Sequence, residues 1–358
     1  MNHPIDELFT TLVEKGGSDL HLLETQPPKI RRHGEVVPIR DAPLTRDDMV
    51  RLLQPICSPP AWKKFTETGD LDFAYEMDEA NRFRCNFYKQ LHGYGAVFRI
   101  IPTKIKTLKE LGVPPVIESF GGYKSGLILV TGPTGSGKST TLAAVVDSIN
   151  TNHSRHIVTI EEPIEFVHPN KKSVITQREV PNETPSFATG LKAALREDAD
   201  VVLVGEMRDL ETIALALTAA ETGLLVFGTL HTNNARKTVD RIIDAFPSDQ
   251  QEQIRTMLAN SLRAVCAQLL LKRSDGGGRL AVNEILIANN AVSAIIREGA
   301  TMKLSDVLKT GKSEGMQLMD DAIDGHLKAG RISPMEAYMK AIDKLRFQEL
   351  LPKDSGIG

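Results

Sequence analysis

Gly132-Pro133-Thr134-Gly135-Ser136-Gly137-Lys138-Ser139 is a complete G-x-x-x-x-G-K-[ST] phosphate-binding motif. The apolar run 127–130 precedes it, and the helix-forming segment 140–146 follows it. A strand, a glycine-rich loop and a helix in this order form the context in which the motif cradles nucleotide phosphates. The glycines let the loop bend tightly, and the new helix directs its partial positive charge at the same anion. The sequence therefore predicts a nucleotide-binding P-loop from Gly132 to Thr140.

Two side chains of this loop carry specific chemistry. Lys138 offers a full positive charge to the β- and γ-phosphates, and Ser139 offers a hydroxyl to Mg²⁺. These residues predict binding of a magnesium nucleotide, although the motif alone does not separate adenine from guanine.

Composition limits the class of protein. The chain has 358 residues, of which 41% are hydrophobic and 25% charged, as expected for two globular domains. Its formal net charge of −3 gives no bulk attraction to nucleic acid or to an anionic membrane, so we expect no nucleic-acid partner. The three cysteines are widely spaced, which argues against a zinc site or a disulfide framework.

Two further features favour a cytosolic protein. The first residues lack the basic and apolar regions of a signal peptide. The apolar stretch 212–230 is interrupted by Thr222-Gly223, so it predicts a buried helix followed by a buried strand instead of a membrane span.

Breaker residues and changes of periodicity divide the chain into four parts. We expect a small α+β domain at 1–100, a linker at 101–120, an α/β core at 121–288 and a helical region at 289–358. The first domain is predicted to contain helices at 5–14 and 44–53 and strands at 19–22, 29–39 (a hairpin), 71–75, 82–87 and 95–100. The core is predicted to contain parallel strands at 126–131, 156–160, 201–204 and 224–229.

Acidic side chains follow two of these core strands. Glu206 comes after the apolar strand 201–204, which we expect to neighbour the P-loop strand. A carboxylate there can share the Mg²⁺ shell and orient or deprotonate the attacking water. Glu161 and Glu162 end the strand 156–160, where adjacent carboxylates favour a nearby cation. The alternative for Glu206 is a surface glutamate at the end of a strand. The alternative for Glu161 and Glu162 is a solvated acidic turn.

Other candidates are a histidine and three arginines. His231 follows the strand 224–229, where an imidazole can contact a γ-phosphate or a catalytic carboxylate. Arg82 and Arg84 alternate along one strand of the first domain and Arg99 lies on another, so they could contact phosphate in a neighbouring subunit's site. Structural roles remain open for all four.

The order of motifs resembles that of the secretion and pilus hexameric ATPases. After the P-loop come Glu161-Glu162-Pro163-Ile164-Glu165, then Gly205-Glu206-Met207-Arg208-Asp209, then Thr222-Gly223 to Leu230-His231-Thr232. The group most similar is that of the type IV pilus retraction ATPases, which drive twitching motility. Gly17 to Leu22 and Gly315-Met316-Gln317 also look like this group.

The resemblance implies a fold, an assembly and roles. It implies an N-terminal PAS-like domain, a C-terminal RecA-like ATPase domain and a homo-hexamer with ATP between subunits. Glu206 would be the catalytic acid, Glu161 to Glu165 the acidic box, and His231 part of the histidine box. Arg82, Arg84 and Arg99 would complete the shared site. The partner implied is an inner-membrane pilus platform protein, engaged at the cytoplasmic face.

Departures from the family pattern leave alternatives open. The acidic box usually has aspartate at Glu162, the histidine box usually has histidine at Leu224, and the retraction motif usually has arginine at Ser293. An accessory or paralogous retraction ATPase is one alternative, and a pilus-assembly or type II secretion ATPase is another. The long N-terminal region and four-cysteine module of assembly ATPases are missing here, which favours retraction. A regulatory scaffold that binds ATP with negligible turnover is the alternative of another class.

Overall fold

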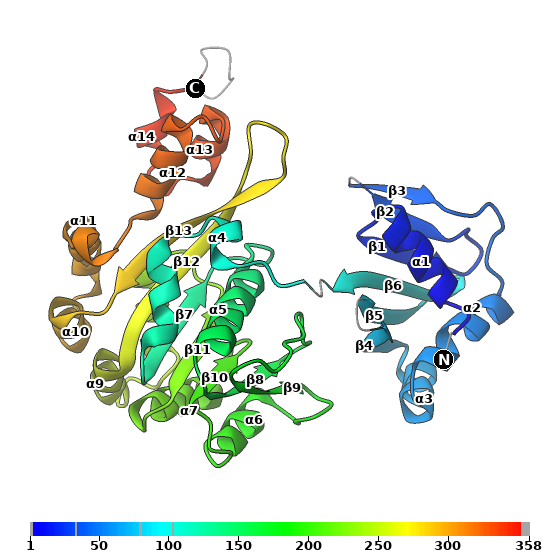
Figure 1. The fold of residues 1–358 in the computed structure, drawn as a ribbon, viewed down its shortest axis with the longest axis horizontal. Helices are drawn as coiled ribbons and strands as arrows, with labels where there is room; N and C mark the ends of the chain where they lie inside the picture. Colours follow the sequence, from blue (N-terminus) through cyan, green and yellow to red (C-terminus); the bar gives the residue numbers. More distant parts are fainter. Residues whose placement is uncertain (1–2, 33, 79–80, 102–103, 352–358) are drawn as a thin grey trace. The chain divides into compact units, whose positions relative to one another are not determined.

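The computed structural model describes residues 3–32, 34–78, 81–101 and 104–351 and divides the chain into two compact units (Figure 1). The first unit consists of residues 1–104 with the segment 163–167, and the second of residues 105–162 and 168–358. Part of the segment predicted as a linker, 101–120, packs within the second unit, where Leu108, Ile117 and Phe120 are buried.

The first unit is built on a six-stranded antiparallel sheet with the strand order β3-β2-β1-β6-β5-β4. The strand β5 alternates as predicted, since Phe83, Cys85 and Phe87 are buried while Arg84 is exposed. The ring of Phe9 stacks on that of Phe83 with centroids 4.0 Å apart. The elements are α1 (Asp6–Glu14), β1 (Asp19–Leu23), β2 (Lys29–Arg32), β3 (Glu35–Pro38), α2 (Arg46–Leu53), α3 (Pro59–Thr68), β4 (Asp70–Asp78), β5 (Asn81–Gln90) and β6 (Gly93–Ile101).

The second unit contains a seven-stranded sheet with the order β13-β12-β7-β11-β10-β8-β9, in which only β13 runs antiparallel to its neighbour among the described strands. The strands β7, β10 and β11 are buried along their whole length, as expected for parallel strands covered on both faces. The α/β fold class is thereby confirmed.

The predicted core strands are present, and the sheet has three more. The strands are β7 (Gly126–Thr131), β8 (His156–Glu161), β9 (Val174–Glu179), β10 (Val201–Val204), β11 (Leu225–Leu230), β12 (Leu262–Lys272) and β13 (Arg279–Ile287). The strands β9, β12 and β13 are not among those predicted from the sequence. Polar residues interrupt β9, and β12 starts directly after a helix, so neither has a clear boundary in the sequence.

Helices cover both faces of this sheet. They are α4 (Leu108–Leu111), α5 (Lys138–Asn152), α6 (Phe187–Ala194), α7 (Leu210–Glu221), α8 (Ala235–Asp244) and α9 (Gln251–Ser261). A 3₁₀ helix, η2, spans Pro115–Gly122. The stretch 212–230 is divided between α7 and β11, as predicted. Among the residues described, no helix combines the length and apolar character needed to cross a bilayer.

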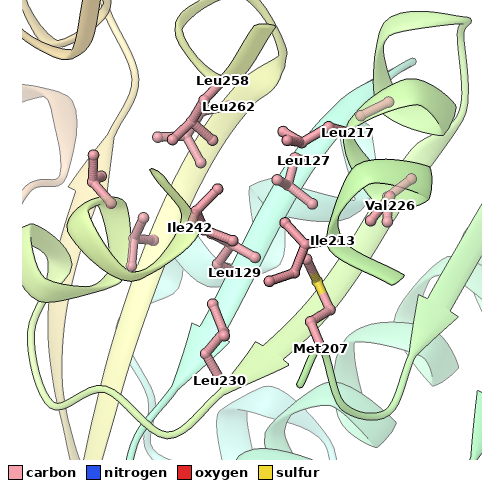
Figure 2. Packing of buried hydrophobic residues seen from close by; sticks show 14 of the residues in the cluster. Leu127, Leu129, Met207, Ile213, Leu217, Val226, Leu230, Ile242, Leu258 and Leu262 are labelled. Atoms are coloured by element: carbon pink, nitrogen blue, oxygen red, sulfur yellow. The ribbon is translucent and has the colours of Figure 1, made fainter. Parts of the chain in front are cut away.

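The larger core cluster fixes the strand ends where the predicted site lies (Figure 2). Met207 is only 1% exposed and packs in this cluster with Leu129, Ile213 and Leu230. It leaves no space beside Gly228, because a Cβ at that glycine would lie 2.2 Å from the Met207 sulfur. Burial of Met207 therefore anchors the chain directly after Glu206.

The C-terminal region is helical, with α10 (Asn290–Arg297), α11 (Leu304–Thr310), α12 (Met319–Lys328), α13 (Pro334–Lys340) and α14 (Leu345–Gln348). Met316, Met319 and Ile323 are buried in this region.

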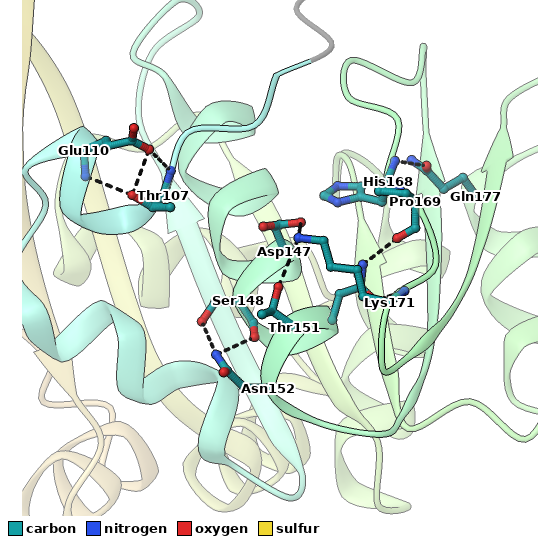
Figure 3. A network of polar contacts seen from close by, with 11 residues as sticks. Thr107, Glu110, Asp147, Ser148, Thr151, Asn152, His168, Pro169, Lys171 and Gln177 are labelled. Atoms are coloured by element: carbon teal, nitrogen blue, oxygen red, sulfur yellow. Dashed lines mark hydrogen bonds and ion pairs between the residues drawn. The ribbon is translucent and has the colours of Figure 1, made fainter. Parts of the chain in front are cut away.

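A polar network ties the loop between β8 and β9 to α5 (Figure 3). The ammonium of Lys171 donates to the Asp147 carboxylate at 2.7 Å and to the Thr151 hydroxyl at 3.0 Å. The Asn150 side chain donates to the Pro169 carbonyl at 2.7 Å. In the same loop the His168 ring is buried, and its Nδ1 has no hydrogen-bond partner among the described residues.

Burial of His168 makes stability depend on pH. Burial lowers the pKa of its imidazole to about 4, from an ordinary value of 6.5. The unfolded chain therefore binds more protons between these values, and the folded state loses stability as the pH falls below about 6.5. We expect the free energy of unfolding to be about 2 kcal/mol lower at pH 5 than at pH 7.5 on account of this residue alone.

Urea unfolding at the two pH values measures this difference. The His168→Gln variant stays neutral at both, so its free energy of unfolding should change less with pH than that of the natural chain. An equal pH dependence in the two proteins would contradict the assignment.

Candidate nucleotide-binding site

Sheet topology brings the predicted residues to one edge. The strands β7, β11, β10 and β8 are parallel neighbours in that order, so their carboxyl ends lie together. The P-loop follows β7, His231 follows β11, Glu206 follows β10, and Glu161 ends β8. The expectation that the Glu206 strand adjoins the P-loop strand is wrong, because β11 lies between them. Ligands of open parallel sheets bind at this edge.

The P-loop backbone has the conformation that its glycines permit. Gly132, Gly135 and Gly137 have φ values of +145°, +77° and +83°, a region that side chains disfavour. Gly132 also has no space for a Cβ, which would lie 2.3 Å from the Gln268 carbonyl oxygen. The Lys138 ammonium crosses the loop and donates to the Gly132 carbonyl at 2.8 Å. The lysine charge is therefore held within the loop that is to receive phosphate.

Backbone hydrogen bonds fix the turn that carries Glu206. The Gly205 N–H donates to the Ile160 carbonyl at 2.8 Å, and the Met207 N–H donates to the Thr229 carbonyl at 3.0 Å. The Thr229 hydroxyl donates to the Gly205 carbonyl at 2.5 Å. Glu206 is thus held between its two neighbouring strands, β8 and β11.

The Glu206 carboxylate has two cationic or potentially cationic partners. Its Oε1 lies 2.9 Å from Nε2 of His231 and also contacts Nε of Arg208. Partial burial raises the pKa of Glu206, but hydrogen bonds and charge from Arg208 and His231 outweigh burial, so its pKa lies below the usual value. Glu206 is therefore ionised at neutral pH, as an acceptor of protons or of metal must be.

Arg208 and Glu162 extend this charged group. The hydrogen bond that Arg208 donates to the Glu206 carboxylate is the main cause that raises the pKa of Arg208, and the negative charge of Glu162 adds to it. A cavity of about 250 Å³ is lined by Glu206, Arg208, His231 and neighbouring residues. The structure thus brings together Glu162, Glu206 and His231, and it adds an arginine that the sequence analysis missed. The sequence offered one signal for this arginine, its position two residues after Glu206, the predicted catalytic acid.

Glu161 points toward a different set of partners. Its Oε1 accepts from the Thr159 hydroxyl at 2.7 Å and from the Gln177 amide at 3.3 Å. These contacts direct the carboxylate along β8 and β9.

The P-loop and the His231 segment line one larger cavity of about 820 Å³. Pro133 forms one side, His231 and Thr232 form another, and residues 339–342 of the C-terminal region close it. The end of β11 thus faces the same space as the phosphate-binding loop.

The three arginines lie in the first unit. Arg82 and Arg84 share one face of β5, and Arg84 lies opposite Arg99 of β6 in the strand register. Arg84 donates to Asp72 at 2.7 Å and Arg99 donates to Asp19 at 2.8 Å. Arg82 lies 3.8 Å from Glu76. Each guanidinium thus has a carboxylate neighbour within its own unit.

Two of the three departures from the family pattern, Leu224 and Ser293, have local structural roles. Leu224 is half-buried and packs against the main core cluster at the start of β11. Ser293 donates its hydroxyl to the Ala259 carbonyl at 2.8 Å, which ties α10 to α9.

Comparison with known proteins gives consistent matches. The model of the type II/IV secretion system protein family matches residues 5–332. The type IV pilus retraction ATPase PilT of Pseudomonas aeruginosa is 48% identical over 337 residues, which cover 94% of this chain and 98% of that protein. A twitching motility protein of Neisseria gonorrhoeae is 49% identical over 314 residues, covering 88% and 84%. A crystal structure of the pilus retraction motor PilT with bound ADP superimposes with a TM-score of 0.91 at 42% identity, covering 98% and 100%.

The P-loop geometry predicts the effect of a single methyl group. Gly132→Ala should abolish detectable ADP binding, because the added Cβ meets the Gln268 carbonyl and φ is positive. Gly325→Ala is the matched control, since Gly325 lies in α12 with no atom within 4 Å of the added Cβ. That variant should bind ADP normally and gain about 1 kcal/mol of stability from helix propensity. Titration calorimetry checks both, and normal binding by Gly132→Ala would contradict the geometry.

Proposed function

We propose that this chain, which belongs to the type II/IV secretion system protein family and is a PilT-like pilus retraction ATPase, works as a homo-hexameric motor at the cytoplasmic face of the inner membrane. The observation that carries the proposal is the placement of the P-loop, Glu206 and His231 along one edge of the parallel sheet. Hydrolysis at that edge would supply the work of removing pilin subunits, which is the basis of twitching motility.

In the proposed site, the P-loop binds the phosphates of ATP. Backbone N–H groups between Gly132 and Gly137 surround the anion, and the Lys138 ammonium exchanges its carbonyl contacts for phosphate oxygens. The Ser139 hydroxyl and the Glu206 carboxylate are oxygen donors, the ligand type that Mg²⁺ prefers beside phosphate and water. Bound Mg²⁺ would offset the negative charge that develops on the phosphoryl oxygens.

Glu206 is proposed as the residue that orients or deprotonates the attacking water. Its carboxylate is ionised and is held by backbone bonds on both sides. His231 and Arg208 share its oxygen, so a phosphate that attracts either side chain would release the carboxylate toward water. Glu161 and Glu162 are proposed to shape this acidic side of the site.

The arginines of the first unit are proposed to complete the site of a neighbouring subunit. Arg84 and Arg99 lie side by side in the register and are partly exposed, with 44% and 69% of their side chains accessible. An arginine supplied in trans accelerates phosphoryl transfer by roughly 10³-fold or more. Such a shared site would couple nucleotide state to subunit orientation, and a pilus platform protein in the membrane is the proposed recipient of the motion.

An accessory retraction ATPase is the second candidate, and Ser293 is the observation that favours it. The family's retraction motif carries arginine there, whereas Ser293 is engaged by the Ala259 carbonyl. The scaffold alternative is not retained, because the chain is an ATPase of this family.

Deletion of the gene should leave the cell with excess pili that do not retract. A plasmid copy of the natural chain should restore retraction, and a Glu206→Gln copy should not. That variant keeps the P-loop, so it should bind ADP normally while hydrolysing ATP at least about 100-fold more slowly. Counting surface pili, with phosphate release by the purified proteins, checks the prediction. Absence of pili after deletion would indicate assembly, and unchanged pili would indicate the accessory role.

Mixing two inactive variants tests the shared site. A Lys138→Ala chain lacks phosphate binding but keeps its arginines, and an Arg84→Ala/Arg99→Ala chain has the reverse defect. If arginines act in trans, random mixed rings should recover about a quarter of the natural ATPase rate, because half of the P-loops are intact and half of their neighbours carry arginine. Each variant assembled alone is the control. A mixture as inactive as its components would refute the arrangement.

A further inference from the structure

One polar side chain is buried directly beneath the P-loop. Gln268 lies on β12, is 1% exposed and stands among apolar neighbours such as Ala267 and Leu271. A glutamine in such a position has to satisfy its amide with protein partners, because water does not reach it.

Gln268 contacts both the loop and the helix that follows it. Its Nε2 donates to the carbonyl oxygen of Ser136 at 2.8 Å, and its Oε1 accepts from the Thr141 hydroxyl at 2.8 Å. Ser136 is the fifth residue of the motif and Thr141 lies in the first turns of α5. A single side chain therefore joins the phosphate-binding loop, its helix and the neighbouring strand.

The bond to Ser136 determines where the next amide points. In a trans peptide group the C=O and N–H vectors are opposed, so a carbonyl of Ser136 held toward β12 turns the N–H of Gly137 away from β12. Phosphate-binding loops work by presenting such N–H groups to the anion. Gly137 also lies close to the glutamine, since a Cβ there would be 3.0 Å from Nε2 of Gln268.

A second layer keeps the Gln268 amide in the donor orientation. The Asn283 amide on β13 donates to Oε1 of Gln268 at 3.0 Å, so this oxygen has two donors and the nitrogen is left to face Ser136. The Gln317 side chain donates to the Asn283 backbone carbonyl at 2.8 Å. The segment Gly315-Met316-Gln317 thus contacts β13 at Asn283, and Asn283 in turn contacts Gln268 beside the P-loop.

We propose that Gln268 is a positioning residue for nucleotide binding. It holds the Ser136–Gly137 peptide with its N–H group toward the phosphates, while Thr141 and Asn283 fix the orientation of its amide. It does not act on the reacting atoms. The inference depends on phosphate binding by the P-loop and is independent of pilus retraction or ring assembly.

The first test replaces the amide by an apolar side chain of similar size. In the full-length chain, Gln268→Leu should bind a fluorescent ADP analogue roughly tenfold more weakly, because the loop loses one fixed N–H donor. The KM for ATP should rise by a similar factor while kcat at saturation stays within about twofold, since ground state and transition state lose the same contact. Natural affinity, or a fall in kcat with unchanged KM, would overturn the proposal.

A second variant separates hydrogen bonding from packing and covers the case in which Gln268→Leu does not fold. Gln268→Glu keeps an acceptor for Thr141 and Asn283, but its carboxylate cannot donate to Ser136. When protonated it can donate, and burial raises a carboxyl pKa. Its ADP affinity should therefore be low at about pH 8 and recover toward the natural value at about pH 6, beyond any change in the natural chain. Natural affinity at the higher pH, or an equal loss at both, would overturn the proposal.

Two control variants show whether a loss of binding comes from the Ser136 bond and whether the P-loop is the binding site. Cys266 is equally buried two residues along β12 and contacts Asn283 at 3.3 Å, so Cys266→Ala disturbs the same strand without breaking the Ser136 bond. It should bind ADP within about twofold of the natural chain, and a loss as large as that of Gln268→Leu would overturn the proposal. Lys138→Ala should lose ADP binding. If it does while Gln268→Leu binds normally, only this inference fails, whereas retained binding by Lys138→Ala would remove the P-loop site as well.

Discussion

Parallel pairing of β7, β11, β10 and β8 is the constraint on which the rest of this structure depends. It places four carboxyl strand ends at one edge, and each end carries a group that phosphate chemistry uses. The strands are buried on both faces by two separate apolar clusters, so their register is fixed by packing and not by the site itself. The polar residues at the edge therefore have defined positions although most of them lie in turns.

The charged groups at this edge are paired with one another or with backbone carbonyls. Glu206 shares one oxygen with His231 and Arg208, and Lys138 is folded onto loop carbonyls. These contacts limit the cost of holding the charged groups partly buried.

The strand β12 supports the P-loop through Gln268. The Gly132 backbone approaches the Gln268 carbonyl too closely for a side chain, and the Gln268 amide bonds to Ser136. The loop conformation is therefore determined jointly by its own glycines and by a strand more than 120 residues further along the chain. The arginines of the first unit are paired with Asp72, Asp19 and Glu76, so these carboxylates would compete with any phosphate for the guanidinium groups.

The sequence by itself determined the elements with strong local signals. The P-loop, the buried strands that precede Glu206 and His231, and the alternation of Arg82 and Arg84 on β5 could all be predicted, because spacing and burial periodicity are local properties. Only the tertiary structure decided the strand order, which inserts β11 between the P-loop strand and the Glu206 strand. It also decided that Arg208 contacts Glu206 and that Gln268 lies beneath Ser136. The strand order and the Gln268–Ser136 contact join segments far apart in the chain, and no local pattern specifies which strand ends will meet. Arg208 and Glu206 are close in the sequence, but the backbone of their turn, held between β8 and β11, decides whether their side chains meet.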